Sequence, residues 1–264
     1  MPAKDIFLTA ESAKEILKRQ GNPTGDVLGI FAPQEKDGKW MVVVRFQDVG
    51  YVKDDDAGKL NADEILNSYK EGTNSVNEER KAKGIPPFYV GGWAEKPRYQ
   101  KDKHEVIWAI QVKEEDKAEA PVVAVNYNTR VLGRRGVLSL NLVTSPETLE
   151  TDKPSALALL DQTSFAKGES YADYQPGKDK SAGYGIAGLI LGGGALAAAA
   201  KFGFLGVAGK WLIGIVLVLK KFIILIIAGA GAALSKFFGK KKKGAEASPP
   251  HTPTSGPPGP PSMP

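Results

Sequence analysis

The chain contains no cysteine and only two histidines among its 264 residues. The lack of cysteine excludes disulfide bonds, thiolate metal sites and cysteine nucleophiles. One histidine, His104, precedes the apolar C-terminal part of the sequence. Catalysis by histidine in the preceding domain would therefore rest on that single side chain.

An excess of basic charge is also missing from most of the chain. Residues 1–180 carry 26 basic and 29 acidic side chains, whereas residues 181–264 carry nine basic and one acidic. The net charge of +5 therefore comes from the C-terminal part. Nucleic-acid binding requires a basic face on a folded domain, so we expect no nucleic-acid partner.

Charge is absent altogether from residues 182–200, which are rich in glycine and alanine. As a helix this segment would measure about 28 Å, close to the hydrocarbon thickness of a bilayer. Gly188 and Gly192 have the spacing of a close-packing seam between membrane helices. The expected packing partner is a second apolar block at residues 202–234.

Two lysines, Lys220 and Lys221, interrupt that second block. Lysines at the centre of a bilayer cost several kcal/mol, so a single straight span is not expected, and the anchor would comprise one to three helical segments. These lysines and a later cluster would contact lipid headgroups, with the later cluster on the cytoplasmic side. The later cluster consists of Lys240, Lys241, Lys242 and Lys243.

The rest of the sequence predicts an α+β fold, with an antiparallel sheet packed by two or three helices and followed by C-terminal transmembrane helices. Strand-like segments follow one another without room for crossover helices. Pro154 must lie in the first turn of the last helix or break it. The predicted strands cover residues 26–33, 39–50, 88–99, 104–115, 120–132 and 136–144, and the predicted helices lie within residues 1–22, 61–84 and 145–160.

These patterns divide the chain into four parts. Residues 1–165 form a soluble α+β head, and residues 166–181, rich in glycine, aspartate and lysine, form a linker. Residues 182–238 form the membrane anchor. Residues 239–264 form a basic and then proline-rich tail that we expect to be disordered.

The densest acidic cluster is Asp54, Asp55 and Asp56. Three carboxylates can hold Ca²⁺ or Mg²⁺, which makes these residues the candidate metal ligands. The cluster lacks the alternating spacing of a calcium loop, and adjacent residues on a strand point apart. A solvated turn is the favoured interpretation, and we expect no cofactor.

Two further features are weaker candidates. His104, beside Glu105, has the chemistry of a general base, but no serine or cysteine nucleophile lies in a known motif, so no catalytic residue is assigned. Arg130, Arg134 and Arg135 flank a glycine-containing turn. They could receive an anion or a lipid headgroup, although a solvated hairpin end is the favoured interpretation.

Several motifs carry a family resemblance. GYVKDDDA, NEERKAKGIPP, GGWAEKPRY, VIWAI and NYNTRVLGRRGVLSLNLV occur in this order before the apolar stretch. Over residues 7–243 the chain resembles a bacterial family of membrane-anchored proteins, domain of unknown function 2167. The resemblance implies membrane attachment and supplies no catalytic residue. Family members usually begin with a secretory signal that this sequence lacks, so the head would be periplasmic if exported and cytoplasmic otherwise.

The leading hypothesis is a non-enzymatic binding or scaffold module of the bacterial cell envelope. It would be anchored in the inner membrane, with the lipid bilayer and either a second copy or an envelope protein as partners. One alternative is a membrane-bound, metal-assisted hydrolase that uses the Asp54–Asp56 cluster or His104. Another is an oligomerising or membrane-perturbing element driven by Gly188 and Gly192.

Overall fold

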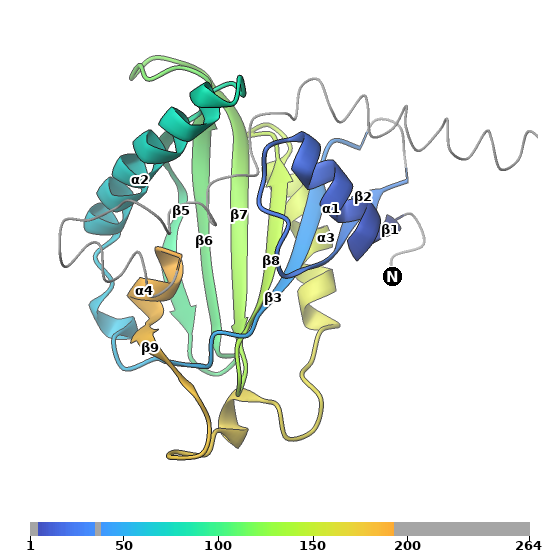
Figure 1. Cartoon of the computed structure of the whole chain (residues 1–264), viewed down its shortest axis with the longest axis vertical. Helices are drawn as coiled ribbons and strands as arrows, with labels where there is room; N and C mark the ends of the chain where they lie inside the picture. The colour runs from blue at the N-terminus through green and yellow to red at the C-terminus, as the bar shows by residue number, and fades with distance from the viewer. Residues whose placement is uncertain (1–4, 35–37, 193–264) are drawn as a thin grey trace, which may run out of the picture. The chain divides into compact units, whose positions relative to one another are not determined.

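A computed structural model describes residues 5–34 and 38–192 of the chain. The described residues form an α+β domain built on a large antiparallel sheet (Figure 1). Its strand order is β1-β2-β3-β8-β7-β6-β5. The strands are β1 (Asp5–Thr9), β2 (Val27–Pro33), β3 (Met41–Gln47), β5 (Tyr89–Gln100), β6 (Glu105–Lys113), β7 (Val122–Leu132) and β8 (Val137–Thr144).

The predicted strands at 26–33 and 39–50 and the later run of four strands are confirmed, and each sequential pair is antiparallel. The register shifts between Val90 and Gly92 in β5, where two adjacent glycines allow a bulge. Strand β1 is an addition, because its residues lie where only a helix was expected. Its five residues pair with β2, and the ring of Phe7 lies 4.8 Å from that of Phe31.

The three predicted helices are present as α1 (Ala10–Arg19), α2 (Ala62–Ala82) and α3 (Leu149–Asp161). The Oδ1 atom of Asn61 caps α2 by accepting hydrogen bonds from two backbone N–H groups at 3.2 Å. Pro154 lies inside α3, beyond its first turn, and the helix continues. The expectation for Pro154 is therefore wrong, because Ala156, Leu159 and Leu160 pack on the sheet and hold the helix together.

The two faces of the sheet carry different helices. Strand register places Val42, Leu142 and Tyr127 in one row, and this row packs against α3. The next row, which includes Val43 and Trp108, faces the other way. In Figure 1, α2 and α1 both lie over that second face, one toward each edge of the sheet, with β7 and β8 between them.

Polar side chains occupy the middle of the α1–α2 face. An apolar cluster around Trp108 lies on the α2 side and another around Val43 lies on the α1 side. Between them runs a set of polar residues on β3, β7 and β8, each less than 9% exposed. This polar stripe consists of Arg45, Asn126, Asn128, Arg130, Ser139 and Asn141.

The expectation of a linker at 166–181 is corrected, because this interval folds onto the domain. Tyr171 is buried in a short 3₁₀ helix, η2 (Tyr171–Asp173). The next residues form β9 (Ser181–Gly185), which pairs in parallel with β4 (Tyr51–Lys53). Its composition predicted a linker because the contacts that fix this interval come from residues distant in sequence, which composition does not reveal.

The start of the expected anchor is corrected for the same reason. After β9 comes α4 (Ile186–Ile190), whose apolar side chains join the core beside α2. None of the helices in the described ranges has both the length and the apolar character needed to cross a membrane. The remainder of the expected anchor, 193–238, and the tail lie outside the described residues.

Candidate functional site

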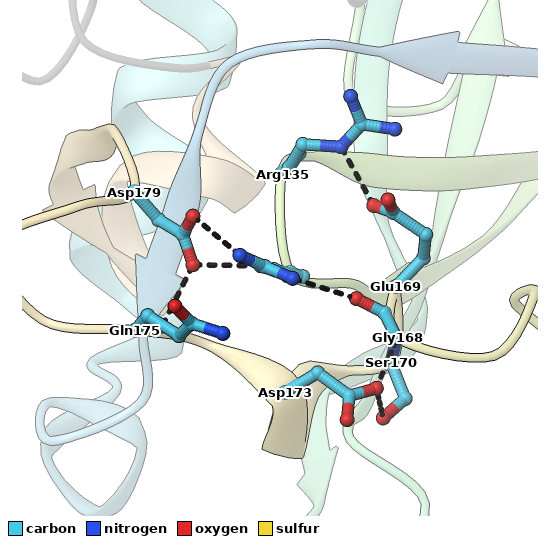
Figure 2. Close-up of polar contacts among 8 residues, drawn as sticks. Arg135, Gly168, Glu169, Ser170, Asp173, Gln175 and Asp179 are labelled. Atoms are coloured by element: carbon cyan, nitrogen blue, oxygen red, sulfur yellow. Dashed lines mark hydrogen bonds and ion pairs between the residues drawn. The ribbon is translucent and has the colours of Figure 1, made fainter.

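The interval 166–190 is held on the domain by contacts that we call the C-terminal clasp. Its central contact joins Arg134, in the turn between β7 and β8, to Asp179 (Figure 2). Nε and Nη2 of Arg134 donate to the two carboxylate oxygens at 2.7 and 2.9 Å, and Nη1 donates to the Gly168 carbonyl at 3.0 Å. A bidentate pair of this kind fixes both orientation and position.

The clasp carboxylate is further stabilised by the backbone. The Gln175 N–H donates to Oδ2 of Asp179 at 2.7 Å. The hydrogen bond from Arg134 and the one from this N–H lower the pKa of Asp179 below its ordinary value. The side chain is therefore ionised at neutral pH, and the interval 175–179 closes on itself around it.

The outer part of the clasp is more exposed. Nε of Arg135 donates to Oε2 of Glu169 at 2.6 Å, but the arginine side chain is 62% exposed, so this pair adds little stability. Ser170 and Asp173 form a capping box at the start of η2. Figure 2 shows both pairs beside the chain at Gly168.

A stack of four aromatic rings extends the clasp to the turn between β5 and β6. Tyr174 stacks on Tyr51 with ring centroids 3.8 Å apart, and Tyr51 stacks on Tyr171 at 4.4 Å. Tyr171 in turn contacts the His104 ring at 4.3 Å, and its hydroxyl donates to the Val52 carbonyl at 3.0 Å. The stack joins η2 to β4 and to the turn between β5 and β6, which are far apart in the sequence.

Asp54 and His104, two of the candidate residues predicted from the sequence, are linked in this region by the side chain of Tyr99. The Tyr99 hydroxyl donates to Oδ2 of Asp54 at 2.8 Å and lies 3.0 Å from Nδ1 of His104. A phenol has one proton, so Nδ1 of His104 must donate to the Tyr99 oxygen, which leaves Nε2 as the proton acceptor of the neutral ring. Burial, and next the bond to Asp54, raise the pKa of Tyr99.

The sequence missed Tyr99 as a site residue, although it lies five positions before His104 across a short turn. The strand predicted at residues 104–115 begins one residue later, at Glu105. His104 precedes β6, is half-buried and has a φ of 52°, which is uncommon for a residue other than glycine.

The three adjacent aspartates do not act together. Asp56 accepts hydrogen bonds from the backbone N–H groups of Ile186 at 2.7 Å and Ala187 at 3.0 Å, so it caps α4. A Cβ atom at Gly185 would collide with this carboxylate. Asp54 binds Tyr99 instead. The described ranges contain no cluster of three metal-ligating side chains.

A groove of about 470 Å³ lies beside the cap. Asp55 and Asp56 line it together with Lys53 and Lys59. Two lysines near two carboxylates oppose the binding of a divalent cation. The groove therefore gives no support to the aspartates as metal ligands.

The expected glycine seam does not form. Gly188 lies within α4, which is buried in the domain. Gly192 follows the end of that helix and has a φ of 101°. The two glycines therefore do not share one helix face. The expected headgroup lysines lie outside the described residues.

The three arginines of the sequence prediction have three different environments. Arg134 and Arg135 belong to the clasp, where carboxylates bind them. Arg130 is buried in β7, and its guanidinium carbon lies 5.0 Å from the centre of the Trp108 ring. The interpretation as a solvated hairpin end therefore holds for Arg135 and not for Arg130 or Arg134.

The fold defines an α+β domain on an antiparallel sheet, with the interval after α3 clasped to one end. The chain belongs to the family described as Protein of unknown function (DUF2167), whose model matches residues 1–231. The family resemblance in the sequence is thus confirmed. A comparison with curated proteins finds no match.

One similar solved structure is the solution structure of cyanobacterial PsbP (CyanoP) from Synechocystis sp. PCC 6803. The match covers 61% of this chain and 81% of that chain, with 12% identity and a TM-score of 0.36. A likeness at this level carries no conclusion about function.

Proposed function

We propose that this protein is a membrane-anchored, non-enzymatic binding or scaffold module of the bacterial cell envelope. The observation that carries the proposal is the clasp. Asp179 is bound through Arg134, and the start of α4 is bound through Asp56. The chain therefore reaches Gly192 at a fixed place on the domain, rather than through a loose linker.

The sequence after this point supports membrane attachment. Its apolar blocks are long enough to enter a bilayer, and its basic residues suit anionic headgroups. A clasped exit would set the orientation of the domain relative to that bilayer. We propose the bacterial inner membrane as the location, with the basic tail in the cytoplasm and the domain in the periplasm when the protein is exported.

Membrane attachment is tested on the full chain in bacterial cells. We expect the protein to stay in the membrane fraction after washes with high salt and alkaline carbonate, which release peripheral proteins. Recovery of the full chain in the soluble fraction would refute the anchor.

The absence of cysteine makes a labelling test of orientation free of background. Asp102→Cys places a thiol in an exposed turn of the domain, and Ser248→Cys places one in the tail. With a membrane-impermeant maleimide we expect Asp102→Cys to react in spheroplasts and Ser248→Cys to react only after lysis. Reaction of both variants only after lysis would contradict a domain facing the envelope.

A second candidate function, a hydrolase, is favoured by one observation, the Asp54–Tyr99–His104 chain. It fixes the His104 tautomer that leaves Nε2 as a base. The test is hydrolysis of p-nitrophenyl acetate and p-nitrophenyl phosphate by the full chain. Turnover that His104→Gln abolishes without changing the unfolding midpoint would favour the hydrolase over the scaffold.

A further inference from the structure

Arg130 is a buried positive charge that lacks a carboxylate partner among the described residues. Its side chain lies within β7, and the residue is 6% exposed. Its hydrogen bond within the described ranges joins Nη1 to the neighbouring Thr129 carbonyl at 3.3 Å. Burial lowers the pKa of Arg130 to about 10, so the guanidinium stays charged at neutral pH. Several of its N–H donors are therefore available to an acceptor.

A network of buried side chains holds the Arg130 guanidinium in place. The guanidinium lies over the Trp108 ring, whose Nε1–H donates to the Tyr69 hydroxyl at 3.1 Å. That hydroxyl donates to the Ile190 carbonyl of α4 at 2.6 Å. All three supporting residues are almost fully buried. The network fixes the surface against which Arg130 rests, which limits the freedom of its guanidinium.

The second arginine of the polar stripe is used differently. Arg45 donates from Nη1 to the Gly25 carbonyl at 2.6 Å and from Nη2 to the Pro23 carbonyl at 2.8 Å. Its guanidinium therefore reaches toward the turn before β2, whereas that of Arg130 reaches toward β6. Ser139 lies opposite both arginines in the register of β8, between the two charges.

Unsatisfied acceptors lie along the same stripe. Oδ1 of Asn126 and Oδ1 of Asn141 are buried, and neither has a hydrogen-bond partner within residues 5–34 and 38–192. Both residues are more than nine-tenths buried. Buried polar atoms without a partner are rare in folded proteins and call for an explanation. Here they lie on the same sheet face as the Arg130 guanidinium, which has no carboxylate partner among the described residues.

We propose that the polar stripe is a binding site for a small hydroxylated oxyanion. Arg130 would hold the phosphate or carboxylate group. Hydroxyl groups of the ligand would donate to the free Oδ1 atoms of Asn126 and Asn141. The ligand would lie along β7 and β8, beside the side chains of Arg130, Asn126 and Asn141.

The register sets the size of this ligand. Asn141 lies diagonally across from Arg130, because Arg130 pairs with Ser139 two residues along β8. Diagonal neighbours on a sheet are about 7–8 Å apart. Asn126 lies four residues from Arg130 along β7, or about 14 Å between Cα atoms, and the long arginine side chain can shorten this span. A glycerol phosphate group fits this range, either as a free ester or as a phosphatidylglycerol headgroup.

This inference names a ligand class for the binding role proposed above and rests on that role. It is tested by thermal unfolding of the full chain in detergent, a readout separate from membrane fractionation. We expect sn-glycerol 3-phosphate to raise the unfolding temperature saturably and more than inorganic phosphate does, and glycerol to have no effect. Nanodiscs of phosphatidylglycerol and phosphatidylcholine form the lipid arm, and stabilisation by phosphatidylglycerol alone identifies a headgroup as the source.

Variants decide whether the response belongs to the stripe. Arg130→Gln should unfold at a higher temperature than wild type without ligand, because a buried charge is removed. Its affinity for sn-glycerol 3-phosphate should fall at least tenfold. Arg19→Gln removes an exposed arginine of α1 and should leave the response unchanged.

A second pair of variants protects the test against misfolding of Arg130→Gln. Ser139→Asp places a carboxylate opposite Arg130 and should raise the unfolding temperature while abolishing the ligand response. Ser12→Asp adds the same charge at an exposed position of α1, away from the stripe, and should retain the ligand response. The proposal is overturned if neither the ester nor the lipid stabilises the wild type, or if Arg130→Gln and Ser139→Asp respond as the wild type does.

Discussion

Arg130 and Arg134 lie four residues apart, yet the fold treats their charges in opposite ways. Arg134 donates to both oxygens of Asp179 and to a backbone carbonyl in the clasp. Arg130 rests on the Trp108 ring, with no carboxylate beside it in the described part of the chain. A charge whose donors are paired within the fold stabilises structure, whereas a buried charge with free donors is suited to bind something else.

Their positions explain this difference. Arg134 lies in a turn, where the returning interval 166–180 can supply acceptors. Arg130 lies on a strand face, where β8 presents Ser139 and Asn141 and β6 presents apolar side chains rather than carboxylates. The clasp and the polar stripe therefore use different arginine contacts, although the Tyr69 hydroxyl links the support of Arg130 to Ile190 in α4.

The largest expected effect comes from removing the aromatic support of the polar stripe. Trp108→Ala deletes a fully buried ring and its hydrogen bond to Tyr69, and should lower the free energy of unfolding by about 3–5 kcal/mol. Urea unfolding measures the loss. Trp93→Ala, at a partly buried ring, should lower the free energy of unfolding by less. Equal losses would show that Trp108 contributes no more to stability than Trp93 does.

A smaller loss is expected when the α4 cap of the clasp is removed. Asp56→Ala leaves two backbone N–H groups without their acceptor, at a cost of about 1–2 kcal/mol. Asp55→Ala is the matched control, because this exposed neighbour should change stability by less than about 0.5 kcal/mol. Chemical denaturation of both variants compares them, and similar values would argue against the cap.

The hydrogen-bond chain at the aromatic stack has a still smaller expected effect. Tyr99→Phe breaks the contacts with Asp54 and His104 and should cost about 1 kcal/mol. Tyr89→Phe removes a hydroxyl that makes no hydrogen bond to another described residue, so it should be nearly neutral. The ¹⁵N chemical shifts of the neutral His104 ring report its tautomer and should change in Tyr99→Phe only. Unchanged shifts would mean that Tyr99 does not set this tautomer.

The smallest expected effect is a loosening of the clasp in acid. The pKa of Asp179 is lowered from 3.8 by Arg134, so its stabilisation is present above about pH 4 and is lost as the pH falls through the lower folded value. Hydrogen exchange of residues 166–180, corrected for intrinsic rates, should rise as the pH falls below about 4. Asp179→Asn should exchange faster at pH 6 and lose most of this pH dependence. Equal profiles would remove Asp179 from the clasp.

Much of the sheet was predictable because its signals are local. The alternation of apolar residues located β2, β3 and β5 to β8, and Asn61 marked the start of α2. Strand β1 was not found, because five residues before a helix carry a weak pattern and gain stability only by pairing with β2. The short strands of the clasp were missed for the same reason, since β4 and β9 lie far apart in sequence.

The candidate site was predictable only in part. Asp54 and His104 stood out by residue type, but the link through Tyr99 depends on a turn and a distant strand. Asp56 was interpreted as part of a solvated turn, whereas it caps a helix 130 residues later. Arg130 looked like its neighbours Arg134 and Arg135, and nothing local distinguishes a buried arginine from an exposed one.

By itself the sequence determined the family, the α+β class with its antiparallel strands, and the apolar, basic character of the C-terminal part. These properties follow from short-range periodicity, ordered motifs and composition, which need no knowledge of contacts. Only the tertiary structure decided that residues 166–190 are part of the domain, and that two arginines four positions apart have opposite surroundings. Both depend on which distant groups the fold brings within hydrogen-bond distance, and that is set by packing rather than by local pattern.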